Sequence, residues 1–192
     1  MNIITNFVDI ATGLLQQFGP ISGVFLVVLE SIIPALPLGV FITLNMNAFG
    51  VFFGFLISYI ATILGCMLSY SIFLFLGEKI LPYLKKKEKY QKLLDLRIKI
   101  KNMPFSNFVT LVALPFTPAS LLNVAAGLSS MNFLKFTISL FLGKIFIVFF
   151  WGYVGTSFID SITNFNTLVT IILMILFVYK ISKLVGKKFH IE

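Results

Sequence analysis

One acidic side chain stands alone in a long apolar stretch near the start of the chain. Glu30 is the only acid between Asp9 and Glu78, and it lies four residues before Pro34. An ionisable group inside membrane hydrocarbon is costly, so a residue of this kind is first considered functional. Glu30 is therefore predicted to bind a substrate or to exchange a proton. The structural alternative is that it caps backbone amides freed at the proline break.

Two other polar side chains, Lys144 and Asn123, also stand in apolar sequence. Lys144 lies near the middle of an apolar stretch, where its ammonium can pair with Glu30 or bind an anionic headgroup. Because lysine side chains snorkel, placement of this ammonium at a membrane surface is an equal alternative. Asn123 can supply an amide at the second proline break, and hydrogen bonding between helices is its alternative role.

Two P-x-x-P pairs interrupt apolar stretches, and a glycine follows each pair. The residues of these two breaks are Pro34, Pro37, Gly39, Pro115, Pro118 and Gly127. Proline has no amide donor and breaks the helical ladder, which leaves helix ends pointing into the protein. The N-terminal ends of such half-helices attract anions such as phosphate. We therefore expect a binding site at the two breaks.

Other kinds of chemistry find little support in these residues. The single Cys66 excludes an intramolecular disulfide and a multi-cysteine metal cage, and His190 is the only histidine. The apolar segments contain no Ser/His, Cys/His or paired-carboxylate arrangement for nucleophilic or acid/base catalysis. The sequence therefore predicts a protein that is not an enzyme and has no catalytic residues, metal or cofactor.

The composition identifies the solvent around this chain. Hydrophobic residues make up 58% of the sequence and charged residues 11%, and the mean hydropathy is +1.01. A soluble domain has about 25% charged residues, so this chain lacks the polar residues to cover a surface in water. We expect an integral membrane protein.

The basic residues are clustered beside apolar stretches. Nine of the 15 Lys and Arg residues lie between Lys79 and Lys101, four more lie between Lys180 and Lys188, and none precedes Lys79. This pattern is typical of cytoplasmic flanks of membrane spans, where basic side chains contact anionic lipids. The expected partners are therefore membrane lipids with anionic headgroups and not nucleic acid. The absence of early basic residues also argues against a cleaved signal peptide.

Apolar periodicity predicts an all-α protein that forms a single membrane domain over residues 1–192. Its expected segments are an amphipathic helix over 1–19, a hairpin plus helix over 20–77, a basic cytoplasmic linker over 78–103, a second hairpin plus helix over 104–156, and a last helix over 167–186. The first helix either lies in the membrane interface or packs against the protein. Pro82 is expected near a helix start, and Trp151 and Tyr153 as interfacial anchors.

The arms beside the prolines are short for a membrane span. An arm of about 13 residues reaches about 20 Å, whereas the hydrocarbon core is about 30 Å thick. A re-entrant hairpin is therefore expected at each break, with a kinked span over 20–50 as the alternative for the first. If both basic clusters are cytoplasmic, the two hairpin-plus-helix units are inverted relative to each other, which is a recurrent transporter design.

The order of these features resembles the DedA superfamily, also called the SNARE-associated Golgi protein or VTT-domain family, in its bacterial branch. The matching residues are Glu30, Pro34, Pro37, Gly65, Tyr70, Gly77, Pro115, Pro118, Asn123, Gly127, Gly143 and Gly155. The resemblance implies an inverted-repeat fold with re-entrant hairpins and roles in lipid translocation and envelope homeostasis coupled to proton-motive force. The sequence departs from the family at Val112, where members often carry an arginine.

These observations predict a multi-pass protein of the bacterial inner membrane with a cytoplasmic C-terminus. The expected function is flippase-like movement of a lipid headgroup, either polyprenyl phosphate or phospholipid, with proton coupling. A proton-coupled carrier of a small solute or ion and a non-transporting membrane scaffold are the alternatives. Assembly into a homo-oligomer is left open.

Overall fold

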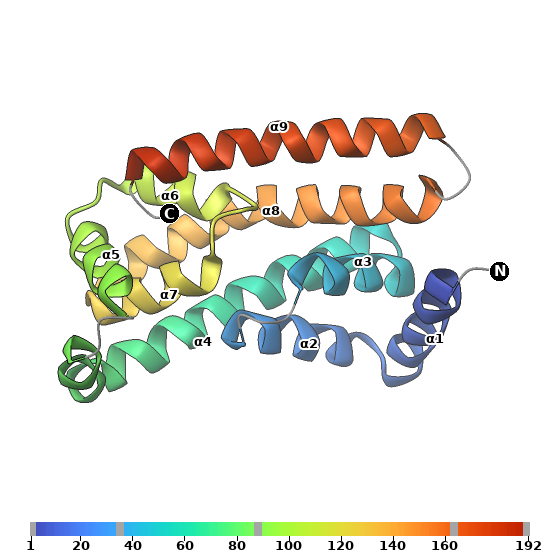
Figure 1. The fold of residues 1–192 in the computed structure, drawn as a ribbon. Helices are drawn as coiled ribbons and strands as arrows, with labels where there is room; N and C mark the ends of the chain where they lie inside the picture. The colour runs from blue at the N-terminus through green and yellow to red at the C-terminus, as the bar shows by residue number, and fades with distance from the viewer. Residues whose placement is uncertain (1–2, 34–36, 87–89, 162–164, 190–192) are drawn as a thin grey trace.

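A computed structural model describes residues 3–33, 37–86, 90–161 and 165–189, and every regular element in these ranges is a helix (Figure 1). The helices are α1 (Ile3–Phe18), α2 (Pro20–Ile32), α3 (Leu38–Phe49), α4 (Val51–Lys85), α5 (Gln91–Lys101), α6 (Phe105–Ala113), α7 (Ala119–Leu128), α8 (Phe133–Ser161) and α9 (Phe165–Phe189). The predicted all-α class is confirmed. The predicted break residue Pro34 lies outside the described ranges.

Three of these helices have the length and apolar composition of membrane spans. Their apolar parts are Val51–Gly77 in α4, Phe133–Phe158 in α8 and Asn166–Lys188 in α9. At about 1.5 Å per residue, each exceeds the hydrocarbon thickness of about 30 Å. Large apolar side chains such as Phe53, Phe149 and Phe177 are exposed on them, as expected for helices surrounded by lipid. The protein is therefore a multi-pass membrane protein.

The chain reverses direction at each proline break (Figure 1). At the first break, α2 runs toward the middle of the molecule and α3 runs back, and α6 and α7 do the same from the opposite end. Ile33 and Leu114, which precede Pro34 and Pro115, have extended backbones because a following proline disfavours the helical conformation. Pro37 and Pro118 then cap the starts of α3 and α7. Each pair of prolines thus ends one half-helix and begins the next.

The two halves of the chain exchange their hairpin arms. The first arm of each hairpin packs on the long helix of its own half, α2 on α4 and α6 on α8. The second arm packs on the long helix of the other half, α3 on α8 and α7 on α4, and α4 and α8 contact each other. In addition, α3 packs on α4. The arms of both hairpins therefore pack against the two longest helices, α4 and α8.

Glycines allow this close packing. A Cβ atom at Gly127 of α7 would lie 2.5 Å from the Tyr70 carbonyl oxygen of α4, and one at Gly65 of α4 would lie 2.5 Å from Ser31 Cβ of α2. In α8, Gly152 receives the side chain of Met46 from α3. Small residues at helix crossings let backbones approach, which is a main source of helix association in lipid.

Helix α1 packs against the protein, as one of its two predicted alternatives requires. It is bent by 115° from α2. Leu15 is buried against Leu44 and Ala48 of α3, and Gln16 Nε2 donates a hydrogen bond of 3.0 Å to the Ala48 carbonyl. The opposite side of α1 is exposed, including Phe18.

The expected helix start near Pro82 is wrong. Pro82 lies inside α4, which continues past the apolar span as far as Lys85. A proline removes one hydrogen bond and crowds the preceding turn, and near the end of a long helix that cost is offset by the hydrogen bonds of the turns before it. The basic segment therefore begins as an extension of a membrane helix.

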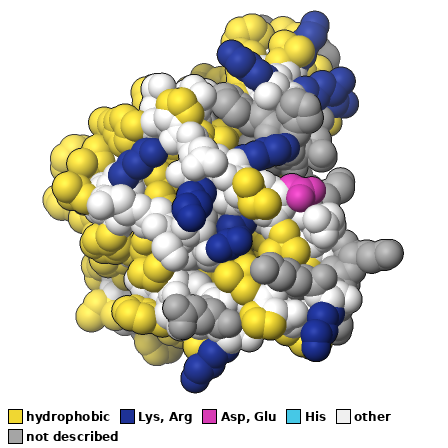
Figure 2. Space-filling model, turned by 90° about the vertical axis from the view of Figure 1, so that its left-hand side faces the viewer, with side chains coloured by type: hydrophobic (Ala, Val, Ile, Leu, Met, Phe, Trp, Pro, Cys, Tyr) yellow, Lys and Arg dark blue, Asp and Glu magenta, His cyan; other side chains and the backbone are white. Residues whose placement is uncertain are grey.

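The basic side chains gather at one end of the molecule, where α5 and the C-terminal part of α4 lie (Figures 1 and 2). Two of them hold backbone carbonyls at this end. Arg97 Nε donates a 2.7 Å hydrogen bond to the Leu128 carbonyl at the end of α7, and Lys135 Nζ donates a 2.7 Å hydrogen bond to the Met103 carbonyl. Cations at a helix C-terminus also complement its dipole. Helix α5 is thereby attached to the second hairpin.

Candidate functional site

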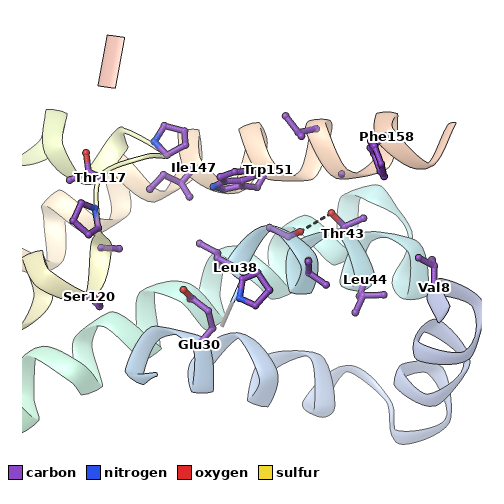
Figure 3. Close-up of a pocket in the computed structure, with 18 of the residues that line it drawn as sticks. Val8, Glu30, Leu38, Thr43, Leu44, Thr117, Ser120, Ile147, Trp151 and Phe158 are labelled. Carbon is purple, nitrogen blue, oxygen red and sulfur yellow. Dashed lines mark hydrogen bonds between the residues drawn. The ribbon is translucent and has the colours of Figure 1, made fainter. Parts of the chain in front are cut away.

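A cavity of about 660 Å³ lies between the two proline breaks (Figure 3). Its lining comes from α1, α2, α3, α7, α8 and the second break. Among the predicted site residues, those that line it are Glu30, Pro37, Gly39, Pro115 and Pro118. The fold thus brings the lone acid and both breaks, which are far apart in the sequence, to one cavity.

The cavity extends from the breaks toward the end of the molecule that carries α1. Glu30, Thr117 and Ser120 lie at its inner end, and Val8 and Phe158 lie at its outer end (Figure 3). The basic face, formed by the Lys and Arg side chains around α5 and the C-terminal part of α4 (Figure 2), lies at the opposite end of the molecule from α1, where Figure 1 places these helices. The cavity therefore reaches the breaks from the end that lacks the basic clusters.

Glu30 is held at the last turn of α2. Its side chain is half-buried and points toward the start of α3, near Leu38 (Figure 3). The positive charge of Lys144 acts on the Glu30 carboxylate, although the two form no ion pair within 4 Å in the described structure. The acid therefore lines the cavity, and the charge of Lys144 offsets only part of the cost of burying its carboxylate.

Most of the remaining lining is apolar, with a few hydroxyl groups. The Thr43 hydroxyl donates a 2.7 Å hydrogen bond to the Gly39 carbonyl of its own helix (Figure 3). The Trp151 ring packs directly on Gly39, where a Cβ atom would lie 2.9 Å from Trp151 Cε3. Trp151, expected to be an interfacial anchor, is half-buried and forms part of the cavity wall. The sequence alone does not show that an aromatic residue near the end of a span lines a cavity.

Lys144 and Asn123 line a small recess beside the inner end of the cavity. The recess shares Thr117 and Ala119 with the cavity and also includes Val112. Lys144 is only 2% exposed, so its side chain is buried inside the protein and does not extend over the protein surface. Asn123 is also 2% exposed, and its Nδ2 donates no hydrogen bond in the described structure, so the alternative of a hydrogen bond from this amide between helices is not observed.

Position 112 is where the family resemblance lacks its arginine, and the structure shows a cation beside it. Gly143 of α8 packs on Val112 of α6, and Lys144 is the next residue of α8. Val112 and Lys144 therefore line the same recess from two different helices. Gly127, by contrast, lines neither the cavity nor the recess, and its close contact is with α4.

The two helix starts add positive character to the site. Helix α3 begins after Pro37 and α7 begins after Pro118, and neither has a side-chain hydrogen bond at its cap. The amides of a first helical turn have no partner within the helix, and the helix dipole favours negative charge there. The site therefore contains two helix N-termini and one cation, which can bind an anion. It also contains one acid, whose carboxylate competes with that anion for the same positive charge.

Comparisons with known proteins agree with this structure. The VTT domain model matches residues 33–157, which span both breaks, helix α4 and most of helix α8. A protein of Bacillus subtilis (strain 168), named uncharacterized membrane protein YhjE, is 30% identical over 178 residues, covering 92% of this chain and 84% of the relative. No solved structure matches the chain significantly. The chain therefore belongs to the VTT-domain family, the DedA or SNARE-associated family of membrane proteins.

Proposed function

We propose that this protein moves the phosphate-bearing headgroup of a lipid, a polyprenyl phosphate or a phospholipid, across the bacterial inner membrane. The observation that carries the proposal is the single cavity that joins both breaks to Glu30 and adjoins Lys144. An apolar cavity with a few polar groups at its inner end suits a ligand with a charged head and a greasy chain. The proposal needs no covalent step, metal or cofactor.

The exchange of arms between the two halves supports an inverted repeat of two re-entrant hairpins. Each half supplies a break to the centre, and the two hairpins enter from opposite ends of the molecule. In transporters of this design, substrates bind near the midplane at the interface of the repeats. With the basic face in the cytoplasm, the described cavity reaches the midplane from the outside.

This orientation predicts a labelling pattern in intact bacteria. In a Cys66→Ala background, a cysteine at Phe158 should react with a membrane-impermeant maleimide added outside the cell. Lys187 is exposed near the C-terminal end of α9, and a cysteine at this position should react only after permeabilisation of the inner membrane. Both positions are exposed, so accessibility from each side decides the result. The reverse pattern would place the basic face outside and contradict the proposal.

Glu30 and Lys144 provide the basis for proton coupling. An anionic headgroup that approaches Lys144 competes with the Glu30 carboxylate for the same positive charge. Protonation of Glu30 removes this repulsion and favours binding, and loss of the proton on the other side favours release. Movement of the headgroup would then be linked to the proton gradient.

Reconstitution of the full chain in liposomes tests this function. Transbilayer movement of a fluorescent phospholipid and of labelled undecaprenyl phosphate should exceed that in empty liposomes, and a pH gradient should change its rate. Rates equal to those of empty liposomes for both lipids would reject lipid movement. Uptake of a small solute under the same gradient would then favour the carrier alternative. If the chain moves neither lipid nor solute but still restores envelope integrity in cells, the scaffold alternative is favoured.

A bulky residue in the cavity should block movement. Val40 lines the cavity and is 43% exposed, so Val40→Trp is expected to fold and to lower the rate of lipid movement at least severalfold. Val51→Trp is the matched control, because Val51 is 67% exposed and lies outside the cavity lining. Equal rates in the two variants would show that the cavity is not the route.

A further inference from the structure

Phe116 attaches the second proline break to the two C-terminal helices. Of the break residues 115–118, Phe116 is the one that does not line the cavity. Its ring instead lies edge-to-face with three other aromatic rings, those of Phe150 and Trp151 in α8 and Tyr179 in α9. Edge-to-face pairs are favourable beyond the apolar area that they bury. This single ring therefore holds the break on both α8 and α9.

The Trp151 ring contacts the first break as well. A Cβ atom at Gly39 would lie 2.9 Å from Trp151 Cε3 and 3.1 Å from Cδ2, so the indole rests on the backbone at the start of α3. The indole centroid lies 5.7 Å from that of the Phe116 ring. Figure 3 shows the indole over this part of α3, near Leu38. One side chain of α8 is therefore in contact with both breaks.

Neither contact is cushioned by a flexible side chain. Gly39 has no side chain, so the indole meets the α3 backbone directly. Phe116 belongs to a turn that is closed by a 3.2 Å hydrogen bond from Thr117 N to the Leu114 carbonyl, and Pro115 restricts the backbone of that turn. Closely packed groups of this kind resist compression, so a displacement of either break must displace the indole.

We propose that Trp151 is a positioning residue that couples the two proline breaks, so that a change in the position of one changes the position of the other. For the movement of a headgroup, coupled breaks provide an order, because the cavity then opens on one side of the membrane only as it closes on the other. This role in movement rests on the proposed function. The coupling itself is a property of the packed rings, and it can be measured without lipid movement.

The test measures the distance between two spin labels on the purified full chain in nanodiscs of phosphatidylcholine. In a Cys66→Ala background, labels at the exposed positions Asn47 of α3 and Thr110 of α6 report how the two hairpins lie relative to each other. Trp151→Leu and Phe116→Leu should each widen the distribution of label distances about twofold or more, because each removes one of the rings that join the breaks. Trp151→Phe keeps a ring at this position and should retain most of the narrow distribution of the parent chain.

A methyl group at Gly39 tests the transmission between the breaks directly. Gly39→Ala places a Cβ atom against the indole and should shift the mean distance between the labels. When Phe116→Leu is also present, the shift should fall to less than about half, because the indole can then move into the space freed at the second break. Gly13→Ala is the matched control, since a Cβ atom at Gly13 would meet no atom within 4 Å.

The intrinsic fluorescence of the chain reports on the same contact without a label, because Trp151 is its only tryptophan. Phe116→Leu should lower the anisotropy of this emission, since the indole gains rotational freedom once the neighbouring ring is removed. Phe149→Leu is the matched control for the loss of an aromatic ring, because Phe149 lies in α8, is 67% exposed and is not part of the cavity lining. It should leave both the anisotropy and the label distances unchanged.

The coupling is rejected if Trp151→Leu leaves the distribution of distances as narrow as Phe149→Leu does, or if Gly39→Ala shifts the mean distance equally with and without Phe116→Leu. Unchanged anisotropy in Phe116→Leu would also reject it. If Trp151→Leu does not fold, the measurements on Phe116→Leu decide, since that variant keeps the indole in place. If all readouts follow the expected pattern while the parent chain moves no lipid in liposomes, the coupling stands and the flippase proposal fails.

Discussion

The Glu30→Gln variant is expected to move lipid no faster than empty liposomes. Glutamine keeps the size and hydrogen-bonding ability of the side chain at the inner end of the cavity, but it cannot ionise. It therefore cannot take up a proton when the headgroup binds, or compete with the headgroup for Lys144 when it leaves. The measurement is transbilayer movement of labelled undecaprenyl phosphate, with and without a pH gradient.

Binding should respond to this change in the opposite sense. With the competing carboxylate removed, Lys144 is available to the phosphate, so Glu30→Gln should bind farnesyl phosphate at least as tightly as the parent chain. Asp9→Asn is the control, because Asp9 is an exposed acid of α1 that lies outside the cavity lining. A Glu30→Gln variant that moves lipid like the parent would show that this acid is structural.

The second large effect is expected at Gly127, where α7 crosses α4. A Cβ atom there would lie 2.5 Å from the Tyr70 carbonyl oxygen and 3.1 Å from the Leu74 nitrogen, and both are backbone atoms that cannot rotate away. Gly127→Val should therefore force the second hairpin away from α4. Overpacking costs about 1–3 kcal/mol when neighbours adjust, and we expect the upper end of that range or more here. The variant should unfold at least several degrees lower and lose its movement of lipid.

Gly13→Val provides the matched control for this substitution. Gly13 is also a helical glycine, and a Cβ atom there would meet no atom within 4 Å. The two variants make the same change in helix propensity, so the difference between their unfolding temperatures reports packing alone. Equal unfolding temperatures for Gly127→Val and Gly13→Val would contradict the close crossing of α7 and α4.

The sequence by itself determined the features that depend on local composition. A bilayer selects spans by length and apolar content, and α4, α8 and α9 therefore lie close to the predicted segments. Proline acts on its own backbone and on the residue before it, so the reversals at the two breaks follow from the P-x-x-P pairs. Glu30 could be identified from the sequence because a single acid in an apolar arm is unusual whatever its contacts are.

Only the tertiary structure decided how the halves meet. The packing of α7 on α4 is tight because of Gly127 in the hairpin arm, whereas the packing of α3 on α8 is tight because of Gly152 in the long helix, which receives Met46. Each crossing needs one small and one large residue, and which helix supplies the small one does not matter for the fit. The two halves therefore correspond in their helix contacts, whereas the residue types at corresponding positions hardly match.

The burial of Lys144 within the protein was decided in the same way. Its position in α8 is compatible with a snorkelling side chain, and only the packing of α6 beside it, with Gly143 against Val112, closes the recess around it. Asn123 and Trp151 likewise gained their places in the site from helices distant in the sequence. A sequence specifies side chains one position at a time, but a binding site is formed by the surfaces that packing brings together, and that information belongs to the fold.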